Sequence, residues 1–420
     1  MKVLIKNAIL TSSTKKANST DILIDNGIIT QISSGIVADA DHIIENDNLH
    51  VSVGWMDCFA NFADPGDEYK ETLETGAAAA AAGGFTEVMI IPNTNPITDN
   101  KSQVEYIKHK SKSLPVTIHP IGAITKNAEG KELSEMYDMH HNGALVFSDG
   151  INCLQSSGIM LKALQYIKAF DGTIIQLPDD KNIGTNGLMN EGIASTKLGL
   201  PGKPAIAEEI LIARDIELLK YSNSKIHFTG ISTKRSLELI TQAKKKGLNI
   251  SCSVTPYHVY FYEDDVADYD TNLKVNPPLR TKEDMMALRD GVKDHSIDFI
   301  ASHHLPQDFD NKICEFEYAK YGMTGLESTF GVLCALDIPF LDFVKMQTEN
   351  IRKIFGLMIP EIKIGEKANL TLFIPGKEYL FTEKNILSRS KNTPFTGKKL
   401  KGYPIGIING DKLFLSDSHY

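Results

Sequence analysis

The middle of the chain alternates between short apolar runs and longer stretches in which apolar residues recur every three or four positions. Stretches 234–245 and 283–293 have the pattern of amphipathic helices. Continuous apolar runs are typical of strands buried on both faces, and their alternation with helices predicts parallel crossover units. We therefore predict an α/β fold in which eight units close into a (β/α)8 TIM-like barrel. The eight runs are residues 51–56, 87–91, 116–119, 143–147, 172–175, 225–228, 249–254 and 297–301.

Both ends of the chain have the pattern of short strands joined by turns. At the N-terminal end, residues 3–10 and 21–24 are rich in strand formers, and Asn26-Gly27 marks a hairpin before Ile28. At the C-terminal end, the apolar run 370–374 precedes a predicted Pro-Gly turn, and two further runs flank Asn409-Gly410. Neither end has enough apolar surface for a core of its own. We predict one small composite β-sandwich from residues 1–50 and 366–420, with the barrel formed by residues 51–365.

Composition narrows the class of protein. Hydrophobic residues make up 42% of the chain and charged residues 23%, which is ordinary for a soluble globular protein. The net charge of -9 argues against a broad nucleic-acid surface. No segment has the roughly 18 apolar residues of a membrane span, and the first residues lack a signal-peptide core. The five cysteines are scattered without a CxxC pair, as expected for buried thiols in a reducing cytoplasm.

The polar motifs lie where the predicted strands end, which is where barrels carry their chemistry. These motifs are Asp64-Pro65-Gly66, Pro92-Asn93-Thr94-Asn95-Pro96, residues 143–149, Leu198-Gly199-Leu200-Pro201-Gly202, Ile231-Ser232-Thr233 and Val275-Asn276-Pro277-Pro278-Leu279-Arg280. On these motifs the chain resembles bacterial dihydroorotase of the amidohydrolase superfamily over nearly its whole length. The resemblance implies an amidohydrolase barrel, a role in pyrimidine biosynthesis and hydrolysis of a cyclic amide.

The positions at which the family binds metal are mostly different here. The resemblance places two metal-binding histidines after strand one, one after strand five and one after strand six, and these positions hold Phe59, Asn61, Gln176 and Gly230. The bridging position after strand four holds Asp149, and the aspartate position after strand eight holds His303. The arginine that grips the substrate carboxylate is replaced by Ala63, and a later substrate-contacting histidine by Gln307. Among the implied ligand contacts, Asn95 and Asn276 survive.

These differences bear directly on the expected chemistry. Opening a cyclic amide in neutral water needs a metal that activates water and polarises the carbonyl group. Catalytic zinc normally takes three protein ligands, and only Asp149 and His303 remain as good donors at these positions. We therefore predict no metal cofactor, with zinc expected only if the site has been rearranged. An alanine also cannot replace the bidentate arginine clamp.

The adjacent histidines His303 and His304 admit three interpretations. They could bind metal with Asp149, act as an acid–base pair, or make structural hydrogen bonds. We favour the last, because an Asp149 that faces His303 across the barrel mouth would satisfy both groups. His303 is the catalytic candidate if the chain is active, and Asn95, Asn276 and His304 are the candidate substrate contacts.

The leading functional prediction is a catalytically impaired member of the family, a pseudoenzyme that serves pyrimidine biosynthesis as a structural or regulatory partner. One alternative is an active dihydroorotase or related cyclic amidohydrolase with a rearranged site. The other is a small-molecule binder that has kept the pocket. We expect a cytoplasmic homodimer without nucleic-acid or membrane partners. The resemblance implies aspartate carbamoyltransferase as a protein partner, because inactive members of the family can serve as its scaffold.

Overall fold

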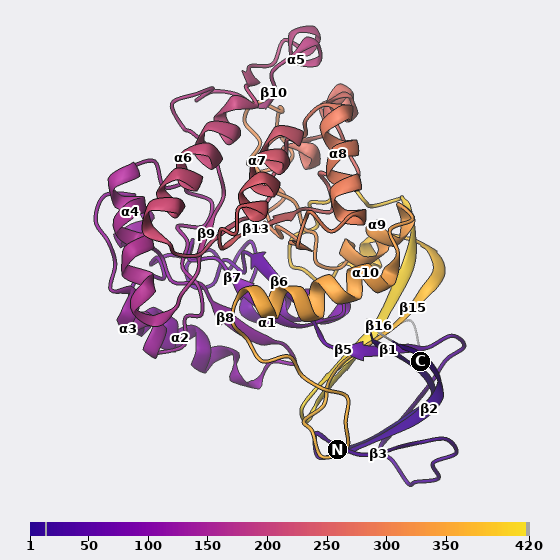
Figure 1. The fold of residues 1–420 in the computed structure, drawn as a ribbon. Helices are drawn as coiled ribbons and strands as arrows, with labels where there is room; N and C mark the ends of the chain where they lie inside the picture. The colour runs from indigo at the N-terminus through magenta and orange to yellow at the C-terminus, as the bar shows by residue number, and fades with distance from the viewer. Residues whose placement is uncertain (13–14, 417–420) are drawn as a thin grey trace.

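The computed structural model describes residues 1–12 and 15–416. Within these residues, strands from both ends of the chain form one curled sheet of eight strands (Figure 1). The two ends meet where β5 pairs in parallel with β1 and antiparallel with β15. The strands of this terminal sheet are β1 (Lys2–Ser12), β2 (Lys15–Asp25), β3 (Ile28–Ser33), β4 (His42–Glu45), β5 (His50–Val53), β15 (Asn369–Leu380), β16 (Lys399–Asn409) and β17 (Lys412–Leu415).

The two turns predicted within the terminal sheet have different outcomes. Asn26 and Gly27 join β2 to β3 with φ angles of 48° and 79°, so the predicted hairpin is confirmed. The predicted Pro-Gly turn after residue 374 is wrong. β15 continues through it to Leu380, and the ladder with β16 absorbs the two residues as an irregularity between Ile374 and Glu378.

The central part of the chain forms a closed ring of parallel strands, so the predicted barrel is confirmed. Residues 143–147 provide one member through single bridges from Phe147 to Gly122 and to Ile174. A bridge between Ala60 and His304 closes the ring. The other members in the described chain are β6 (Trp55–Ala60), β7 (Phe85–Ile90), β8 (Thr117–Pro120), β9 (Ile174–Gln176), β12 (Ile226–Phe228), β13 (Ile250–Val254) and β14 (Phe299–Ile300).

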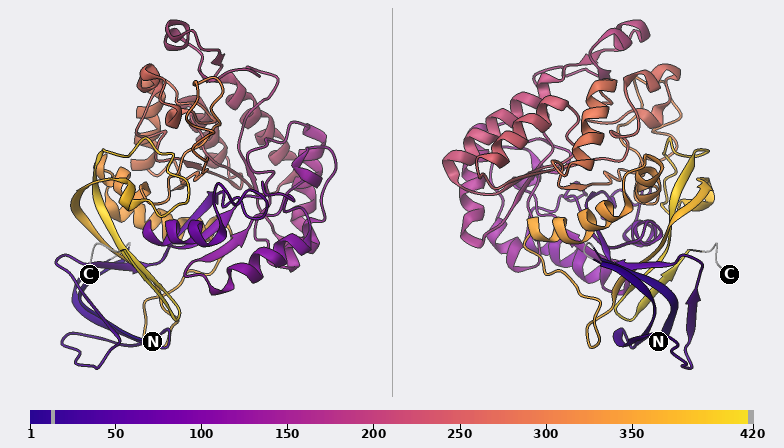
Figure 2. Two further views of the ribbon diagram at one scale, coloured as in Figure 1. Left: turned by 180° about the vertical axis from the view of Figure 1, so that it is seen from behind. Right: turned by 45° about the vertical axis from the view of Figure 1, so that its right-hand side comes forward.

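Helices surround the barrel on its outside (Figure 2). Helix α7 has the predicted bounds, Lys234–Lys245, and it begins where the Thr233 side chain accepts a hydrogen bond from the N–H of Ser236. None of the described helices combines the length and apolar character that crossing a membrane requires. The other α-helices of the described chain are α1 (Leu73–Ala82), α2 (Lys101–Lys110), α3 (Met136–His141), α4 (Ser157–Tyr166), α5 (Ile193–Leu198), α6 (Ile206–Ser222), α8 (Lys282–Lys293), α9 (Thr329–Ala335), α10 (Phe340–Lys345) and α11 (Ile351–Ile354).

The junction between sheet and barrel lies at Gly54. The apolar run 51–56 was predicted as one strand, but it divides there between β5 of the terminal sheet and β6 of the barrel. A Cβ atom on Gly54 would lie 1.9 Å from the side-chain oxygen of Asn369, so the close approach of the two bodies requires glycine. Trp55 follows, fully buried, and packs on Phe330 and Phe373.

Candidate functional site at the barrel mouth

Three residues fill the centre of the barrel mouth. Phe59 lies in β6, Gly230 follows β12 and His303 follows β14. The rings of Phe59 and His303 stack with centroids 4.4 Å apart, and neither residue is exposed to solvent. Gly230 has φ +65°, and a Cβ atom on it would lie 2.4 Å from Cε1 of His303. The histidine ring therefore occupies the space that a side chain at position 230 would need.

His303 is the end of a chain of hydrogen bonds inside the barrel. Its Nε2 lies 2.7 Å from the hydroxyl of Thr229, which accepts a hydrogen bond from Ser253 at 3.1 Å. Ser253 in turn lies 3.0 Å from Nε2 of His227, whose Nδ1 lies 2.8 Å from the hydroxyl of Ser251. Burial lowers the pKa of His303 to about 3 and that of His227 well below its usual range, so both rings are neutral at pH 7.

Asp149 does not face His303, and the predicted pairing of these residues is wrong. Both carboxylate oxygens of Asp149 accept hydrogen bonds from Thr125, one from its N–H at 2.9 Å and one from its hydroxyl at 2.6 Å. Burial is the first cause of a raised Asp149 pKa. Gln176 is also buried, and its amide accepts from the N–H of Leu154 and donates to Asp215, each at 3.3 Å. For Asp149, Thr125 in the loop before helix α3 thus supplies the hydrogen-bond donors that were expected from His303.

Asn61 and His304 are tied into the surrounding backbone. The side-chain oxygen of Asn61 accepts from the N–H of Ala63 at 2.7 Å. His304 is fully buried, with Nε2 3.3 Å from a carboxylate oxygen of Glu71 and Nδ1 accepting from the N–H of Gly325 at 3.2 Å. Because Nδ1 accepts, the ring proton is on Nε2 and faces Glu71. Both nitrogens of this candidate substrate contact are therefore engaged within the protein.

The two asparagines that the resemblance implies as ligand contacts, Asn95 and Asn276, lie in different surroundings. Asn95 is exposed on the loop after β7. Asn276 is half-buried, donates to Asp179 at 3.1 Å and accepts from Lys203 at 2.8 Å, and Lys203 also lies 2.7 Å from Asp179. These three side chains line a cavity of about 240 Å³ together with Tyr321. The Lys203–Asp179 pair was missed from the sequence, where the one cue was a charged residue directly after the apolar turn 198–202.

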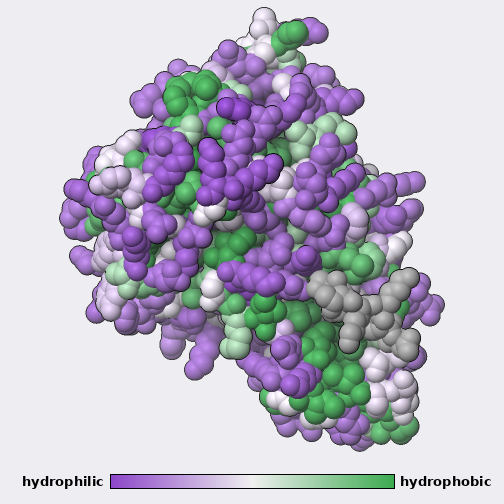
Figure 3. All heavy atoms as spheres, viewed as in Figure 1, coloured by the Kyte–Doolittle hydropathy of each residue, from purple (hydrophilic) through white to green (hydrophobic). Residues whose placement is uncertain are grey.

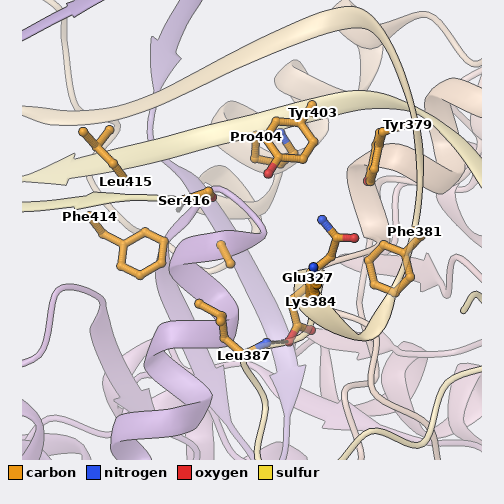
Figure 4. Close-up of a pocket in the computed structure, with 12 residues that line it drawn as sticks. Glu327, Tyr379, Phe381, Lys384, Leu387, Tyr403, Pro404, Phe414, Leu415 and Ser416 are labelled. Atoms are coloured by element: carbon orange, nitrogen blue, oxygen red, sulfur yellow. Dashed lines mark hydrogen bonds between the residues drawn. The ribbon is translucent and has the colours of Figure 1, made fainter. Parts of the chain in front are cut away.

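A separate cavity of about 280 Å³ lies beside the C-terminal strands (Figure 4). It is lined by aromatic side chains, among them Tyr379, Phe381 and Phe414. Glu327 at its edge accepts from the N–H of Leu387 at 3.1 Å. This cavity contains none of the residues that the sequence predicts for the site.

Comparison with known proteins identifies the family. Residues 50–236 match the family model described as Dihydro-orotase-like. The dihydroorotase of Caldicellulosiruptor saccharolyticus is 39% identical over 424 residues, which cover 99% of each chain. That of Ruminiclostridium cellulolyticum is 38% identical over 417 residues, 98% of this chain and 97% of its own. This chain belongs to the dihydroorotase family.

Solved structures of other proteins share the fold of this chain. The L-hydantoinase (dihydropyrimidinase) from Arthrobacter aurescens matches with a TM-score of 0.86 at 22% identity, covering 99% of this chain and 96% of that chain. A D-hydantoinase from Thermus sp. matches with a TM-score of 0.82 at 20% identity, covering 100% and 96%. At these identities the likeness shows the fold alone.

The mouth residues do not fit the zinc centre that the dihydroorotase family implies. Phe59 and Gly230 have no donor atom, and the amides of Asn61 and Gln176 are poor zinc ligands. Asp149 is already hydrogen-bonded on both carboxylate oxygens. Across the described part of the chain, no three His, Cys, Asp or Glu side chains converge in an arrangement suited to a metal ion.

Proposed function

We propose that this member of the dihydroorotase family is catalytically inactive as an isolated chain and serves pyrimidine biosynthesis as a structural or regulatory partner. The observation that carries the proposal is the stack of Phe59 on His303 beside Gly230, which fills the centre of the mouth with carbon atoms and a neutral ring. Hydrolysis of a cyclic amide needs an activated water and a polarised carbonyl group. A fully buried centre whose one metal donor is His303 provides neither.

A turnover assay tests the inactivity. The purified chain is incubated with dihydroorotate, with and without added zinc, and we expect no hydrolysis above the uncatalysed background. Zinc-dependent turnover that disappears in His303→Ala and in Asp149→Ala, but persists in a control variant of the exposed residue His141, would contradict the proposal. That result would favour an active amidohydrolase with a rearranged site.

The proposal includes a homodimer and a complex with aspartate carbamoyltransferase. Hydrophobic side chains gather over the terminal sheet in Figure 3. Exposed apolar residues on and beside its strands include Val37 at 98%, Ile43 at 59% and Ile28 at 39% relative exposure. Exposed apolar surface of this kind is typical of sites that bind another protein. A partner that binds only the folded transferase would stabilise it by mass action.

Co-expression tests the partner. The chain and the host's aspartate carbamoyltransferase are expressed together and separated by size-exclusion chromatography at micromolar concentration. We expect co-elution, a raised melting temperature of the transferase, and loss of the dimer or the complex in Val37→Glu but not in Lys131→Glu. Separate elution with unchanged transferase activity and melting temperature would refute the scaffold, and a small-molecule binder would then be the better hypothesis.

A further inference from the structure

A larger cavity, of about 510 Å³, lies at the rim of the mouth. Its lining comes mainly from residues 307–313, in the loop after β14, and from the segment 383–392, with Tyr69, Thr271 and Asn272 beside them. Cavities of roughly this size, about 300–1,000 Å³, hold small organic ligands. Its lining combines apolar side chains with polar groups, among them Tyr69, Gln307, Phe309, Lys312, Ile313 and Arg389.

Lys312 is the unusual group in this cavity. It is only 8% exposed, and its Nζ donates to the carbonyl oxygens of Thr271 and Lys320, each at 2.8 Å. Within the described residues, no carboxylate forms an ion pair with it. Burial lowers the pKa of Lys312 to about 7, and nearby Lys274 lowers it further, against Asp270 and Cys314, which raise it. A large fraction of the amine is therefore neutral at pH 7.

Two other polar groups of the cavity, the Arg389 guanidinium and the Gln307 side-chain oxygen, have no partner among the residues that the structure describes. Among the hydrogen bonds and ion pairs of the described residues, none involves the exposed guanidinium of Arg389. The side-chain oxygen of Gln307 is buried and has no hydrogen-bond partner in the same part of the chain. Buried polar atoms are almost always satisfied, so an unpaired acceptor that lines a cavity points to a ligand with a donor group. The unpaired guanidinium of Arg389 is a binding group for an anion, and it lies in a lining that also includes the carboxylates of Asp308 and Glu383.

We propose that Lys312 is a covalent attachment site for small anionic aldehydes or keto acids that also carry a hydroxyl group, whose anionic group binds Arg389 and whose hydroxyl donates to the side-chain oxygen of Gln307. A neutral amine can donate both N–H groups to the two carbonyl oxygens and still direct its lone pair at a carbonyl carbon. The C–N bond forms as the carbonyl oxygen takes up a proton. Loss of water, which carries away the oxygen and the two amine hydrogens, then leaves a C=N imine. No oxidant or reductant is consumed.

Reductive trapping with pyridoxal 5′-phosphate tests the proposal. The full chain is incubated with this probe at pH 7, the imine is reduced with borohydride, and labelled lysines are mapped by mass spectrometry. An ordinary lysine has less than about 0.1% neutral amine at this pH. We therefore expect Lys312 to be labelled at least about tenfold faster than Lys131, whose side chain is 80% exposed. Lys274, which is buried but does not line the cavity, should stay unlabelled.

Variants separate the anion site from the amine. Arg389→Gln should slow labelling of Lys312 by pyridoxal 5′-phosphate about tenfold, the loss of roughly one charge-assisted contact, and leave labelling by pyridoxal unchanged. Arg235→Gln, on the exposed face of α7, is the matched control and should change neither. Lys312 labelled no faster than Lys131 in the unmodified chain would overturn the proposal, and equal sensitivity of both probes to Arg389→Gln would overturn the anion site.

Discussion

A methyl group placed on Gly230 would enter the space of the His303 ring, and the cost of Gly230→Ala measures how tightly the mouth is filled. The new Cβ would lie 2.4 Å from Cε1 and 3.0 Å from Nε2 of His303. The left-handed φ of +65° costs an alanine about 1–2 kcal/mol. Overpacking against a ring held in place by Phe59 adds about 1–3 kcal/mol. We expect Gly230→Ala to lower the free energy of unfolding by about 2–5 kcal/mol.

Two further variants isolate the contact. Gly356 has a φ of +68° with nothing within 4 Å of its Cβ position, so Gly356→Ala should cost only the backbone term of about 1–2 kcal/mol. In a His303→Ala background the cost of Gly230→Ala should fall to the same value, a coupling of about 1–3 kcal/mol. The assay is urea unfolding followed by the fluorescence of Trp55, the one tryptophan of the chain. If Gly230→Ala and Gly356→Ala lowered the free energy of unfolding equally, the claim that the His303 ring fills the space at position 230 would be refuted.

Three other results are expected. The pKa of His303 is about 3 in the folded protein, which is below its value in the unfolded chain. Its contribution to the free energy of unfolding is therefore complete above about pH 6.5 and is lost toward pH 3, at up to about 1.4 kcal/mol per pH unit. The urea midpoint of His303→Gln should fall less steeply with acid than that of the unmodified chain, and an equal slope would contradict this. His304→Ala, which leaves the buried carboxylate of Glu71 without its imidazole donor, should cost about 2–4 kcal/mol in the same assay, and a cost under about 1 kcal/mol would mean that the pair is unimportant. Phe59→His combined with Asn61→His should not produce dihydroorotate hydrolysis with added zinc, and measurable turnover would show that the remaining positions suffice.

The barrel could be predicted from the sequence because its helices and turns are specified by residues within each element. Helix α7 matches its predicted bounds, since the Thr233 cap and the apolar spacing of 234–245 lie within the segment itself. The Asn26-Gly27 hairpin is likewise encoded by the two residues that adopt it. The division at Gly54 was not visible, because it depends on a contact with Asn369, more than 300 positions away.

The candidate site was predicted as a set of positions but not as a set of contacts. Sequence resemblance identified Phe59, Gly230 and His303 as departures from the family. It could not show that the three occupy one another's space, which is a property of strand ends brought together by barrel closure. The expected partnership of Asp149 with His303 failed for the same reason, because Thr125 supplies two donors from a different loop.

Metal content is the most direct test of the central claim that this mouth does not hold a zinc centre. The chain is expressed in medium supplemented with zinc, dialysed without chelator and analysed for bound metals per polypeptide. We predict well below one equivalent of zinc, and no increase in melting temperature when zinc is added. About two equivalents of zinc that survive dialysis, together with a raised melting temperature, would contradict the account.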